Sequence, residues 1–598
     1  MVWNAGPLAH TSDRAGLPLV NPSAVEHLAV DRAGRLIWAS CDRHTTPTAP
    51  CGLPRMDVAS PPASRFPWWI PAGGLLLAAL YLPTLATPFD FIDDGNLVYP
   101  VEGRSLTGHV GLWWERVQAN YAHLGPFRPT LWIHWQLQSN LFDGDPLSWR
   151  ICRLLWTGLA ASMFLWLLRE LKIHPIAAIL AGALAMWNPY RNEIWTSLTL
   201  AEGVAMPYAL FGLVAARKAS TTDRPLIWEI AAAVAVLVAL GCKNVFAALV
   251  PAQMVLRMWP DGLTIRDAWR RNGWRSLALG VTLLMPAIHF VHYKTHWHPG
   301  QYETPGPSLA QFGRLLNTLK GAMSPEFMGV GVVLAAITVG VSRRTQLPDT
   351  SSAPEAKANR NSARPALACA IMLLLGGVAM YLPVTIISGR YSMPAVWGLD
   401  ILFGLLLTAF VAAPVTVWKK AAWGGVCAGI AVVAAANIGR QEKFAARATM
   451  LWVALHYVEA NAPLGAKVAW MSGDSLKGAL NVEEGIHFQW HLYHRGRGDV
   501  RIGLFDESGA PLERTELQPL DGPPQYALAG QGAVGPGGFE PVRKYAAAYW
   551  YGWKHYDWLL SRKPVPGFHD DATHRAEVGK LFQAMLQMGP PAAAVGDN

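Results

Sequence analysis

Long apolar runs dominate the chain between residues 67 and 440. The first, residues 68–87, is free of charge over about 20 positions, the length that a helix needs to cross the hydrocarbon core of a bilayer. The pattern predicts about eleven membrane-spanning helices, and hence a mainly α, polytopic membrane helix bundle over residues 67–439. The other ten runs lie near residues 147–168, 175–190, 194–216, 226–241, 245–259, 276–293, 323–342, 365–388, 395–418 and 421–438.

A polar leader precedes the first run. Residues 1–66 are mixed in charge and rich in proline toward their end, with no apolar segment that would make a signal peptide. This composition predicts a disordered leader. Met56 is a more natural start for a membrane protein, so residues 1–55 could be a misassigned start, and a cytosolic regulatory tail is the alternative.

The long apolar runs end near residue 440. The segments KVAWMSG, VRIGLFDESGAPL and PQYALAG have the alternation and glycine-rich borders of strands. The aromatic segment 543–563 is predicted to be helical and to pack on the bundle or stack on a sugar. Residues 440–590 are therefore predicted to form a small α/β domain, followed by a frayed tail at 591–598.

The composition supports a membrane protein. Of 598 residues, 52% are hydrophobic and 15% are charged, against roughly 25% charged in an ordinary soluble domain. The 27 Trp residues fit a chain with two bilayer faces, where Trp gathers. These values exclude a disordered protein and argue against a soluble one. The six Cys residues suggest neither a disulfide framework nor a Cys-based metal site.

The net charge of +9 reports membrane topology and indicates no nucleic-acid partner. Lys and Arg gather in short loops such as 169–172, 217–218 and 257–275, and cytoplasmic loops retain positive charge. This pattern places the N-terminus in the cytoplasm. An odd number of spans then places the C-terminal domain on the outer side of the membrane.

The most acidic membrane exit follows the first run, where FIDDGN contains Asp93 and Asp94 shortly after Asp90. One interpretation is a solvated loop with an aspartate capping the next helix. The other is a carboxylate that acts as a general base, with a pKa set by partial burial and neighbouring charge.

The stretch 108–146 is too polar to span a bilayer and predicts interfacial helices along the membrane surface. Within it, Arg128 is a candidate phosphate ligand, because guanidinium pairs with two phosphate oxygens at once. The alternative is an arginine that extends to lipid headgroups.

Three further clusters of polar residues follow on the predicted outer face. They are Arg191 and Glu193 in WNPYRNEIW, Lys243 in GCKN, and Arg390 with Tyr391 in SGRYSMP. Each alone is typical of an aromatic and basic interface anchor. Together with the acids of the first loop they predict a convergent polar site over an apolar bundle.

Two histidine-rich stretches are candidates for a metal site. HFVHYKTHWH and EEGIHFQWHLYH, the latter at helical spacing, lack an HExxH pattern or a cysteine partner. Surface or interfacial histidines are the preferred interpretation, and no metal site is predicted.

The order of these motifs resembles the GT-C class of polytopic membrane glycosyltransferases, especially protein O-mannosyltransferases and bacterial lipid A aminoarabinose transferases. The matching segments are FIDDGN, FRPTLWIHW, WNPYRNEIW, GCKN and GRYSMP. The resemblance implies a GT-C fold and transfer of a sugar from a polyprenyl-phosphate donor at the outer face. It implies that Asp93 or Asp94 is the base, and that Arg128, Lys243 and Arg390, with Tyr391 beside it, hold the donor phosphate.

Two departures from the family pattern bear on these roles. The second acidic motif of the family is here NPYRNE, so Glu193 is a candidate by position only. The larger lumenal domain of the protein mannosyltransferases is absent from the sequence pattern, which weakens the case for a protein acceptor. The acceptor classes that stay open are a glycan, a lipid and, with less support, a protein.

The resemblance also fixes the expected setting of the reaction. It implies an integral protein of a bacterial inner membrane whose C-terminal domain is periplasmic. Direct attack by one activated acceptor would invert the anomeric carbon. No cofactor is required, although a divalent cation could bridge phosphate and carboxylate. The alternatives are a polymerase or ligase acting on polyprenyl diphosphate, a lipid or solute transporter, and a non-catalytic scaffold.

Overall fold

The computed structural model divides the chain into two units, Met1–Phe66 and Pro67–Asn598. In the first unit, β1 (His27–Val30) pairs antiparallel with β2 (Leu36–Ala39), so the leader that was predicted to be disordered contains a hairpin. The structure describes residues 27–30, 36–39, 67–91, 94, 97, 106–124, 127–142, 144–296, 313, 317, 354–380, 393–412, 417–472, 482–506, 509–512, 517, 520–530, 540–547 and 556–562.

The first apolar run forms α1 (Trp69–Ala78), continued by the 3-10 helix η1 (Ala79–Ala86). Its main neighbour is α5 (Pro146–Glu170). Glycines let these two backbones approach, since a Cβ added to Gly74 would lie 2.7 Å from the carbonyl oxygen of Gly158. Small residues at helix contacts are the usual means of close packing in membranes.

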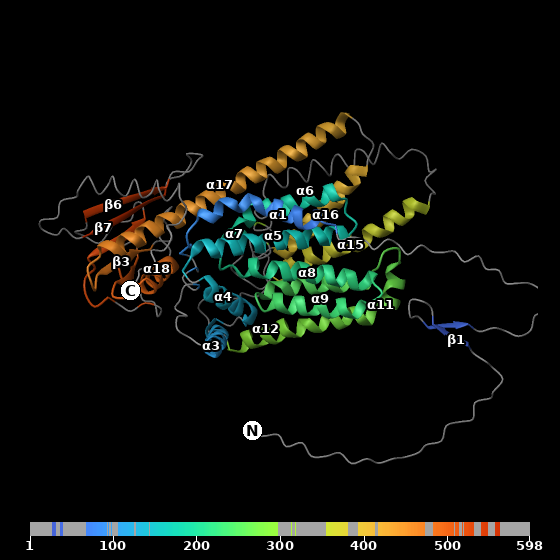
Figure 1. The fold of residues 1–598 in the computed structure, drawn as a ribbon, viewed down its shortest axis with the longest axis horizontal. Coiled ribbons are helices and arrows are strands. Elements are labelled where there is room, and N and C mark those ends of the chain that lie inside the picture. The colour runs from blue at the N-terminus through green and yellow to red at the C-terminus, as the bar shows by residue number, and fades with distance from the viewer. Residues whose placement is uncertain are drawn as a thin grey trace, which may run out of the picture. The chain divides into compact units, whose positions relative to one another are not determined.

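Helices make up most of the second unit and run alongside one another (Figure 1). Several begin with proline at the first helical position, where the missing N–H would have no partner in any case. Besides α1, η1 and α5, the described helices up to residue 461 are α3 (Leu106–Leu124), α4 (Pro129–Phe142), α6 (Pro175–Trp187), η2 (Pro189–Arg191), α7 (Asn192–Thr196), α8 (Ala201–Thr221), α9 (Pro225–Leu240), η3 (Asn244–Ala248), α10 (Leu249–Met258), α11 (Ile265–Gly280), η4 (Val281–Leu283), α12 (Leu284–His296), α15 (Pro354–Ala379), α16 (Met393–Ala412) and α17 (Val417–Asn461).

Among the described residues, most predicted runs coincide with one of these helices or with a helix and an adjoining 3-10 turn, and two are clearly broken. The run 194–216 is broken, because Pro189–Thr196 and Ala201–Thr221 meet at a 98° bend. The run 276–293 is divided between the end of α11, η4 and α12. Hydropathy averages over such breaks, so it reported each as one continuous segment.

Among the described residues, four helices are long and apolar enough to cross a membrane, and the bent pair would make a fifth. Four shorter apolar helices accompany them. The predicted run 323–342 lies outside the described residues. The count of about eleven spans and the interfacial placement of α3 and α4 therefore stay predictions.

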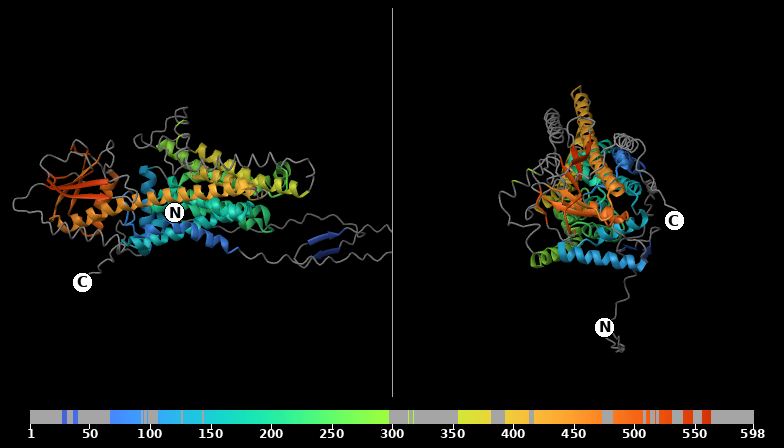
Figure 2. Two further views of the ribbon diagram at one scale, coloured as in Figure 1. Left: turned by 90° about the horizontal axis from the view of Figure 1, so that it is seen from above. Right: turned by 90° about the vertical axis from the view of Figure 1, so that its left-hand side faces the viewer.

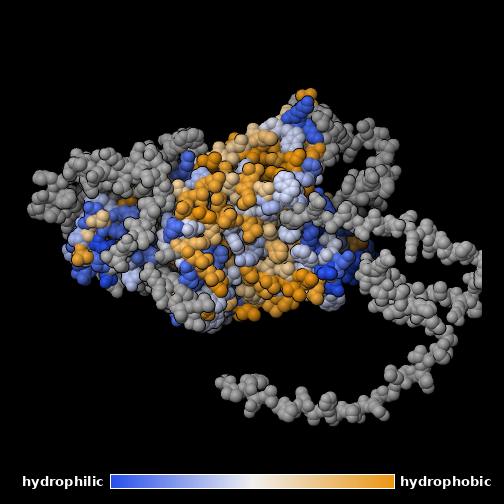
Figure 3. Space-filling view, viewed as in Figure 1, coloured by the Kyte–Doolittle hydropathy of each residue, from blue (hydrophilic) through white to orange (hydrophobic). Residues whose placement is uncertain are grey.

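The surface of the bundle supports a membrane setting. Large apolar side chains such as Leu76, Leu226, Ile227 and Ile288 are more than half exposed. The space-filling view shows apolar residues covering the middle of the visible face, with polar residues toward its two ends (Figure 3). An apolar surface of this extent is expected against lipid and not against water. The chain is an integral membrane protein.

The helix α17 runs from the bundle to the sheet of the C-terminal region (Figures 1 and 2). The predicted domain boundary at 439/440 therefore falls inside one helix. The sheet has the order β4-β3-β5-β7-β6, in which β3 (Lys467–Met471) pairs parallel with β4 (Arg501–Phe505) and β5 (Tyr526–Gly530). These three strands confirm the three predicted from sequence, and α18 (Val482–His494) is the helix whose spacing the sequence indicated.

The prediction of a helix over residues 543–563 is wrong. This segment contributes β6 (Glu540–Ala547) and β7 (Tyr556–Arg562), which pair antiparallel with each other. The second of them also pairs antiparallel with β5. Aromatic residues are at least as well suited to strands as to helices. Pairing with an existing strand edge, which local sequence does not reveal, decides the outcome here.

Candidate active site

The acidic loop after η1 is closed around Asp94. The side chain of Asp94 is fully buried at 0% exposure. Its Oδ2 accepts a hydrogen bond from the backbone N–H of Asp90 at 2.8 Å, and its Oδ1 accepts one from the hydroxyl of Thr199 at 3.1 Å. The carboxylate thus joins its own loop to the segment that precedes α8.

Burial raises the pKa of the Asp94 carboxyl from 3.8 to about 8. The nearby charge of Arg150 lowers this pKa, the charge of Asp90 raises it, and the two hydrogen bonds lower it. A carboxyl that titrates near neutrality can exchange a proton with a substrate group. A fully buried Asp94 does not match the solvated loop of the alternative interpretation.

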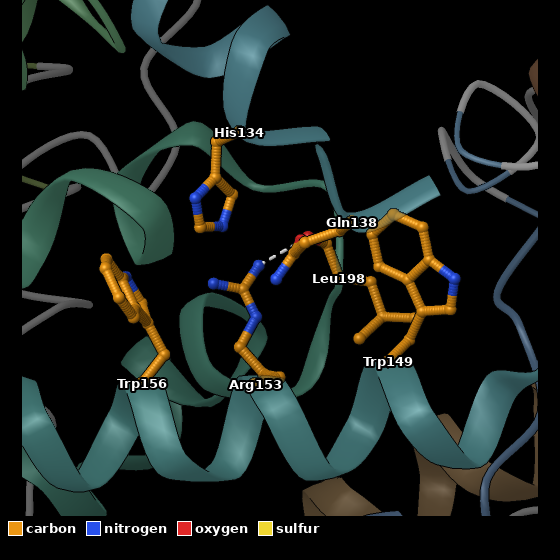
Figure 4. A pocket seen from close by; sticks show the side chains of 6 residues that line it. All are labelled: His134, Gln138, Trp149, Arg153, Trp156 and Leu198. Carbon is orange, nitrogen blue, oxygen red and sulfur yellow. Dashed lines mark hydrogen bonds between the residues drawn. The ribbon is translucent and has the colours of Figure 1, made fainter. Parts of the chain in front are cut away.

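Two arginines of α5 face this loop. Arg150 is 1% exposed and donates to three backbone carbonyl oxygens, those of Thr87 (3.2 Å), Pro88 (2.7 Å) and Thr196. Arg153, one helical turn further, donates from Nη2 to the carbonyl oxygen of Leu198 at 2.6 Å. Arg150 therefore fastens α5 to the start of the acidic loop and to the end of α7, and Arg153 fastens it to the segment between α7 and α8 (Figure 4).

Sequence reasoning missed both arginines. They lie in the RICR segment of the run 147–168, for which hydropathy predicts only a membrane span. Ionisable residues inside such a span are costly and are commonly functional, so their presence was a usable signal. The same holds for Glu202, which lies inside the predicted run 194–216 and is 0% exposed.

Glu202 is the partner of Lys243. The two form an ion pair in which the side chain of Lys243 is 16% exposed and that of Glu202 is 1% exposed. A phosphate group at Lys243 would have to compete with this carboxylate. The role of Lys243 as a phosphate ligand stays a prediction.

Arg128 lies near the same place. The backbone N–H groups of Thr130 and Leu131, at the start of α4, donate to the carbonyl oxygen of Gly241 at 3.1 and 3.3 Å. Burial raises the pKa of the neighbouring Cys242 thiol, and the charge of Arg128 acts in the opposite direction. The FRPT and GCKN motifs, distant in sequence, are thus neighbours in the fold.

The motif WNPYRNEIW has a different environment. Arg191 is fully buried and donates to both oxygens of Asp400, from Nη1 at 2.6 Å and from Nη2 at 3.2 Å. Glu193 is exposed and lies in the first turn of α7. The Arg191–Asp400 ion pair has the geometry of a structural pair between α16 and the η2–α7 turn.

Three residues of the predicted site lie outside the described residues. They are Asp93, Arg390 and Tyr391. Their predicted roles are unchanged.

The C-terminal helix α18 contacts the acidic loop. The carbonyl oxygen of Phe91 accepts a hydrogen bond from Nδ1 of His487 at 3.0 Å. The ring of Phe91 lies 4.8 Å from the ring of His491 and 6.2 Å from that of Trp452 of α17. The loop that contains Asp94 is therefore supported from the C-terminal region as well as from α5.

Over the part of the chain that the structure describes, no three His, Cys, Asp or Glu side chains are grouped as metal ligands. His289 accepts a hydrogen bond from the backbone N–H of Phe127 at 3.4 Å, and His292 stacks on Tyr121 at 4.0 Å. These two histidines pack α12 against the α3–α4 segment.

Fold and site together define an integral membrane helix bundle with a buried ionic cluster at the helix ends. No known protein family matches the chain in sequence, and no curated protein does. Two solved structures with some likeness are crystal structures of ArnT from Cupriavidus metallidurans. One is bound to undecaprenyl phosphate (15% identity, 82% of this chain and 98% of that chain, TM-score 0.40) and the other is the apo state (12%, 82% and 97%, TM-score 0.43). Neither likeness assigns a role to any residue of this chain.

Proposed function

We propose that this protein transfers a sugar from a polyprenyl-phosphate donor to an acceptor at the outer face of the membrane. The acceptor hydroxyl is deprotonated by a carboxylate of the Asp93–Asp94 pair, and nearby cations hold the phosphate as it departs. Direct attack by the acceptor inverts the anomeric carbon.

One observation carries the proposal, namely the convergence of motifs that lie far apart in sequence. Asp94 of FIDDGN bonds to Thr199, and Arg153 bonds to the adjacent Leu198. Glu202, three residues further, pairs with Lys243 of GCKN. The fold thus brings acids and cations together at one set of helix ends, as the motif resemblance to GT-C enzymes leads us to expect.

The location suits a lipid-linked donor. Its isoprenoid chain can stay among the apolar helices while its phosphate and sugar reach the polar cluster. A positioned base supplies about 10²- to 10⁴-fold in rate, and fixed cations stabilise the phosphate charge that develops as the glycosidic bond breaks.

The burial of Asp94 suggests a division of work between the adjacent acids. Both Asp94 oxygens accept internal hydrogen bonds, so this residue suits positioning of the loop. Its burial, which raises the pKa, favours retention of a proton. Asp93, the adjacent residue in the sequence, is then the carboxylate that contacts the acceptor hydroxyl. The proposal requires that one of the two removes the acceptor proton.

The test is turnover of a radiolabelled polyprenyl-phosphate sugar pool by membranes that contain the wild type, Asp93→Asn or Asp94→Asn. Protein level and thermal unfolding are measured alongside. One variant is expected to bind donor and to lose turnover by about 10²- to 10⁴-fold. If both variants release lipid phosphate and transfer label like the wild type, the carboxylate mechanism is wrong. Failure of the wild type to transfer label would favour transport.

A further inference from the structure

The helix α11 presents a cluster of arginines at the surface. Its sequence, IRDAWRRNGWRSLALG, contains four Arg residues and one acidic residue, Asp267. The four, here called the α11 arginines, are Arg266, Arg270, Arg271 and Arg275, and their side chains are exposed. This helix lies at the end of the bundle far from the sheet, where the visible surface changes from apolar to polar (Figures 1 and 3).

The opposite face of α11 attaches the helix to α10. Asn272 donates from Nδ2 to the carbonyl oxygen of Met258 at 3.1 Å, and the hydroxyl of Ser276 donates to that of Met254 at 2.6 Å. These two positions and the buried Ala268 are four residues apart and share one side of the helix. Packing therefore fixes α11 with its arginines directed away from the bundle.

Other cations at this end of the bundle are neutralised inside the protein. The ion pairs are Arg217–Asp261 at 2.5 Å, Arg257–Glu229 at 2.5 Å and Lys218–Glu170 at 2.9 Å. By contrast, the α11 arginines make no hydrogen bond or ion pair within the described residues. The carboxylate of Asp267 accepts a hydrogen bond from the hydroxyl of Thr264 at 2.6 Å, at the start of the helix. The α11 arginines thus form a positive surface without an internal counter-ion.

The exposed face becomes apolar as the chain continues through η4 into α12. Leu277 is 39% exposed, Leu284 59% and Ile288 66%. Side chains of this kind belong against hydrocarbon. Because a helix rises 1.5 Å per residue, Arg275 lies about 3 Å along the axis from Leu277 and Arg270 about 10 Å. The α11 arginines are therefore placed just outside the hydrocarbon core, where phospholipid headgroups lie.

Two tryptophans lie among the α11 arginines. Trp269 is 52% exposed and Trp274 is 86% exposed. Exposed indole rings are typical of the headgroup level of a bilayer, where one part of the ring meets acyl chains and another meets water. A surface that combines these rings with guanidinium groups, directly beside lipid-facing residues, suits a lipid headgroup better than a soluble acidic partner.

This surface is separate from the acidic loop. From Arg153, beside that loop, α5 rises by about 26 Å to Glu170. The carbonyl oxygen of Glu170 accepts a hydrogen bond from Nε of Arg217 at 3.4 Å, and Arg217 also donates to the carbonyl oxygen of Trp259, directly after α10. The α11 arginines accordingly lie at the membrane face opposite the acidic loop, the face that the charge pattern predicts to be cytoplasmic.

We propose that the α11 arginines, together with Trp269 and Trp274, bind the headgroups of anionic phospholipids in the surrounding membrane. Guanidinium pairs with two phosphate oxygens at once, and clustered basic residues beside a membrane-spanning helix attract anionic lipids. The lipid is a component of the bilayer and not a substrate, so this inference does not depend on the proposed sugar transfer.

The test is lipid binding by the full chain in mild detergent, titrated with phosphatidylglycerol or with phosphatidylcholine of the same acyl chains. Bound lipids are counted by native mass spectrometry. The double variant Arg270→Gln/Arg271→Gln is expected to bind phosphatidylglycerol roughly 30-fold more weakly, about 5-fold for each arginine. Its binding of phosphatidylcholine is expected to be unchanged. The preference of the wild type for phosphatidylglycerol should also fall as salt is raised, because the charges are exposed.

The matched control is Lys172→Gln/Arg224→Gln. It removes the same charge from two exposed positions in short loops at the same end of the bundle, and it is expected to bind phosphatidylglycerol like the wild type. Equal losses in the two double variants would show that net positive charge attracts the lipid, which overturns the assignment to α11. Unchanged phosphatidylglycerol binding by Arg270→Gln/Arg271→Gln overturns it as well.

Folding is measured by thermal unfolding in the same preparations. The α11 arginines are exposed, so both double variants are expected to unfold like the wild type. Arg266→Gln/Arg275→Gln removes the other two charges of the cluster and is expected to weaken phosphatidylglycerol binding to the same extent. Unchanged binding by this folded variant contradicts the proposal even if the first variant is unstable.

A soluble acidic partner is the competing occupant. The wild type in nanodiscs of phosphatidylcholine alone is titrated with a polyglutamate peptide, and weak or no binding is expected. Tight binding that Arg270→Gln/Arg271→Gln abolishes, combined with an unchanged phosphatidylglycerol preference in that variant, would assign the surface to an acidic protein and overturn the lipid proposal.

Discussion

Variants of the ion pair between Arg191 and Asp400 distinguish a catalytic from a structural role of the NPYRNE motif. Both side chains are at most 1% exposed, and Arg191 also donates to the carbonyl oxygen of Ala185 at 2.9 Å. The perturbation is Arg191→Met or Asp400→Leu alone, and then both together. If the pair is structural, each single variant leaves one buried charge without its partner.

The size of the effect follows from this burial. Removing one partner of a buried ion pair costs about 3–5 kcal/mol, because the remaining charge is neither solvated nor paired. Replacing both partners with apolar groups of similar volume is often neutral or stabilising. Here Nε of Arg191 is buried without a partner among the described residues, so the intact pair is incompletely compensated. We therefore expect the double variant to be close to the wild type in stability.

The assay is unfolding of the purified protein by denaturant in mild detergent, together with sugar transfer by folded material. Each single variant should lose about 3–5 kcal/mol of unfolding free energy, and the double variant should recover most of it. The double variant should also transfer sugar near the wild-type rate. The structural interpretation is refuted if the single variants unfold like the wild type and lose turnover, since Arg191 would then serve the reaction.

Three further predictions concern the first helix and the acidic loop. The pKa of the Asp94 carboxyl in the folded protein, about 8, lies above its ordinary 3.8, so its contribution to stability is present at low pH and is lost as pH rises through 8. Between pH 3.8 and 8 the unfolding free energy should therefore fall by at most about 1.4 kcal/mol per pH unit. Asp94→Asn should abolish that slope in denaturant titrations repeated at several pH values. Gly74→Ala should cost about 1–3 kcal/mol through overpacking against α5. Gly111→Ala, which meets nothing within 4 Å inside α3, should raise the melting temperature slightly, because Ala favours a helix over Gly. His487→Leu should cost about 1–3 kcal/mol, because it leaves the Phe91 carbonyl unpaired; if His487→Gln, which can restore a donor, melts no higher than His487→Leu, the hydrogen bond is not the cause.

The sequence was sufficient for features that depend on local pattern. Most of the apolar runs became helices, and the strands β3, β4 and β5 formed where alternation predicted them. Uncharged length and hydropathy are properties of contiguous residues, and the bilayer requires both of any helix that crosses it.

Only the tertiary structure decided which polar residues are partners. Arg191 and Asp400 are separated by 209 positions, and Lys243 pairs with Glu202, which lies 41 positions earlier in the chain. Likewise, β7 became a strand because β5 offered it an edge. A buried charged group needs a partner that its side chain can reach. The packing of the helices determines which group that partner is. The sequence therefore indicated where charged residues cluster, whereas helix packing assigned Arg150 and Arg153 to backbone carbonyls and Lys243 to a carboxylate.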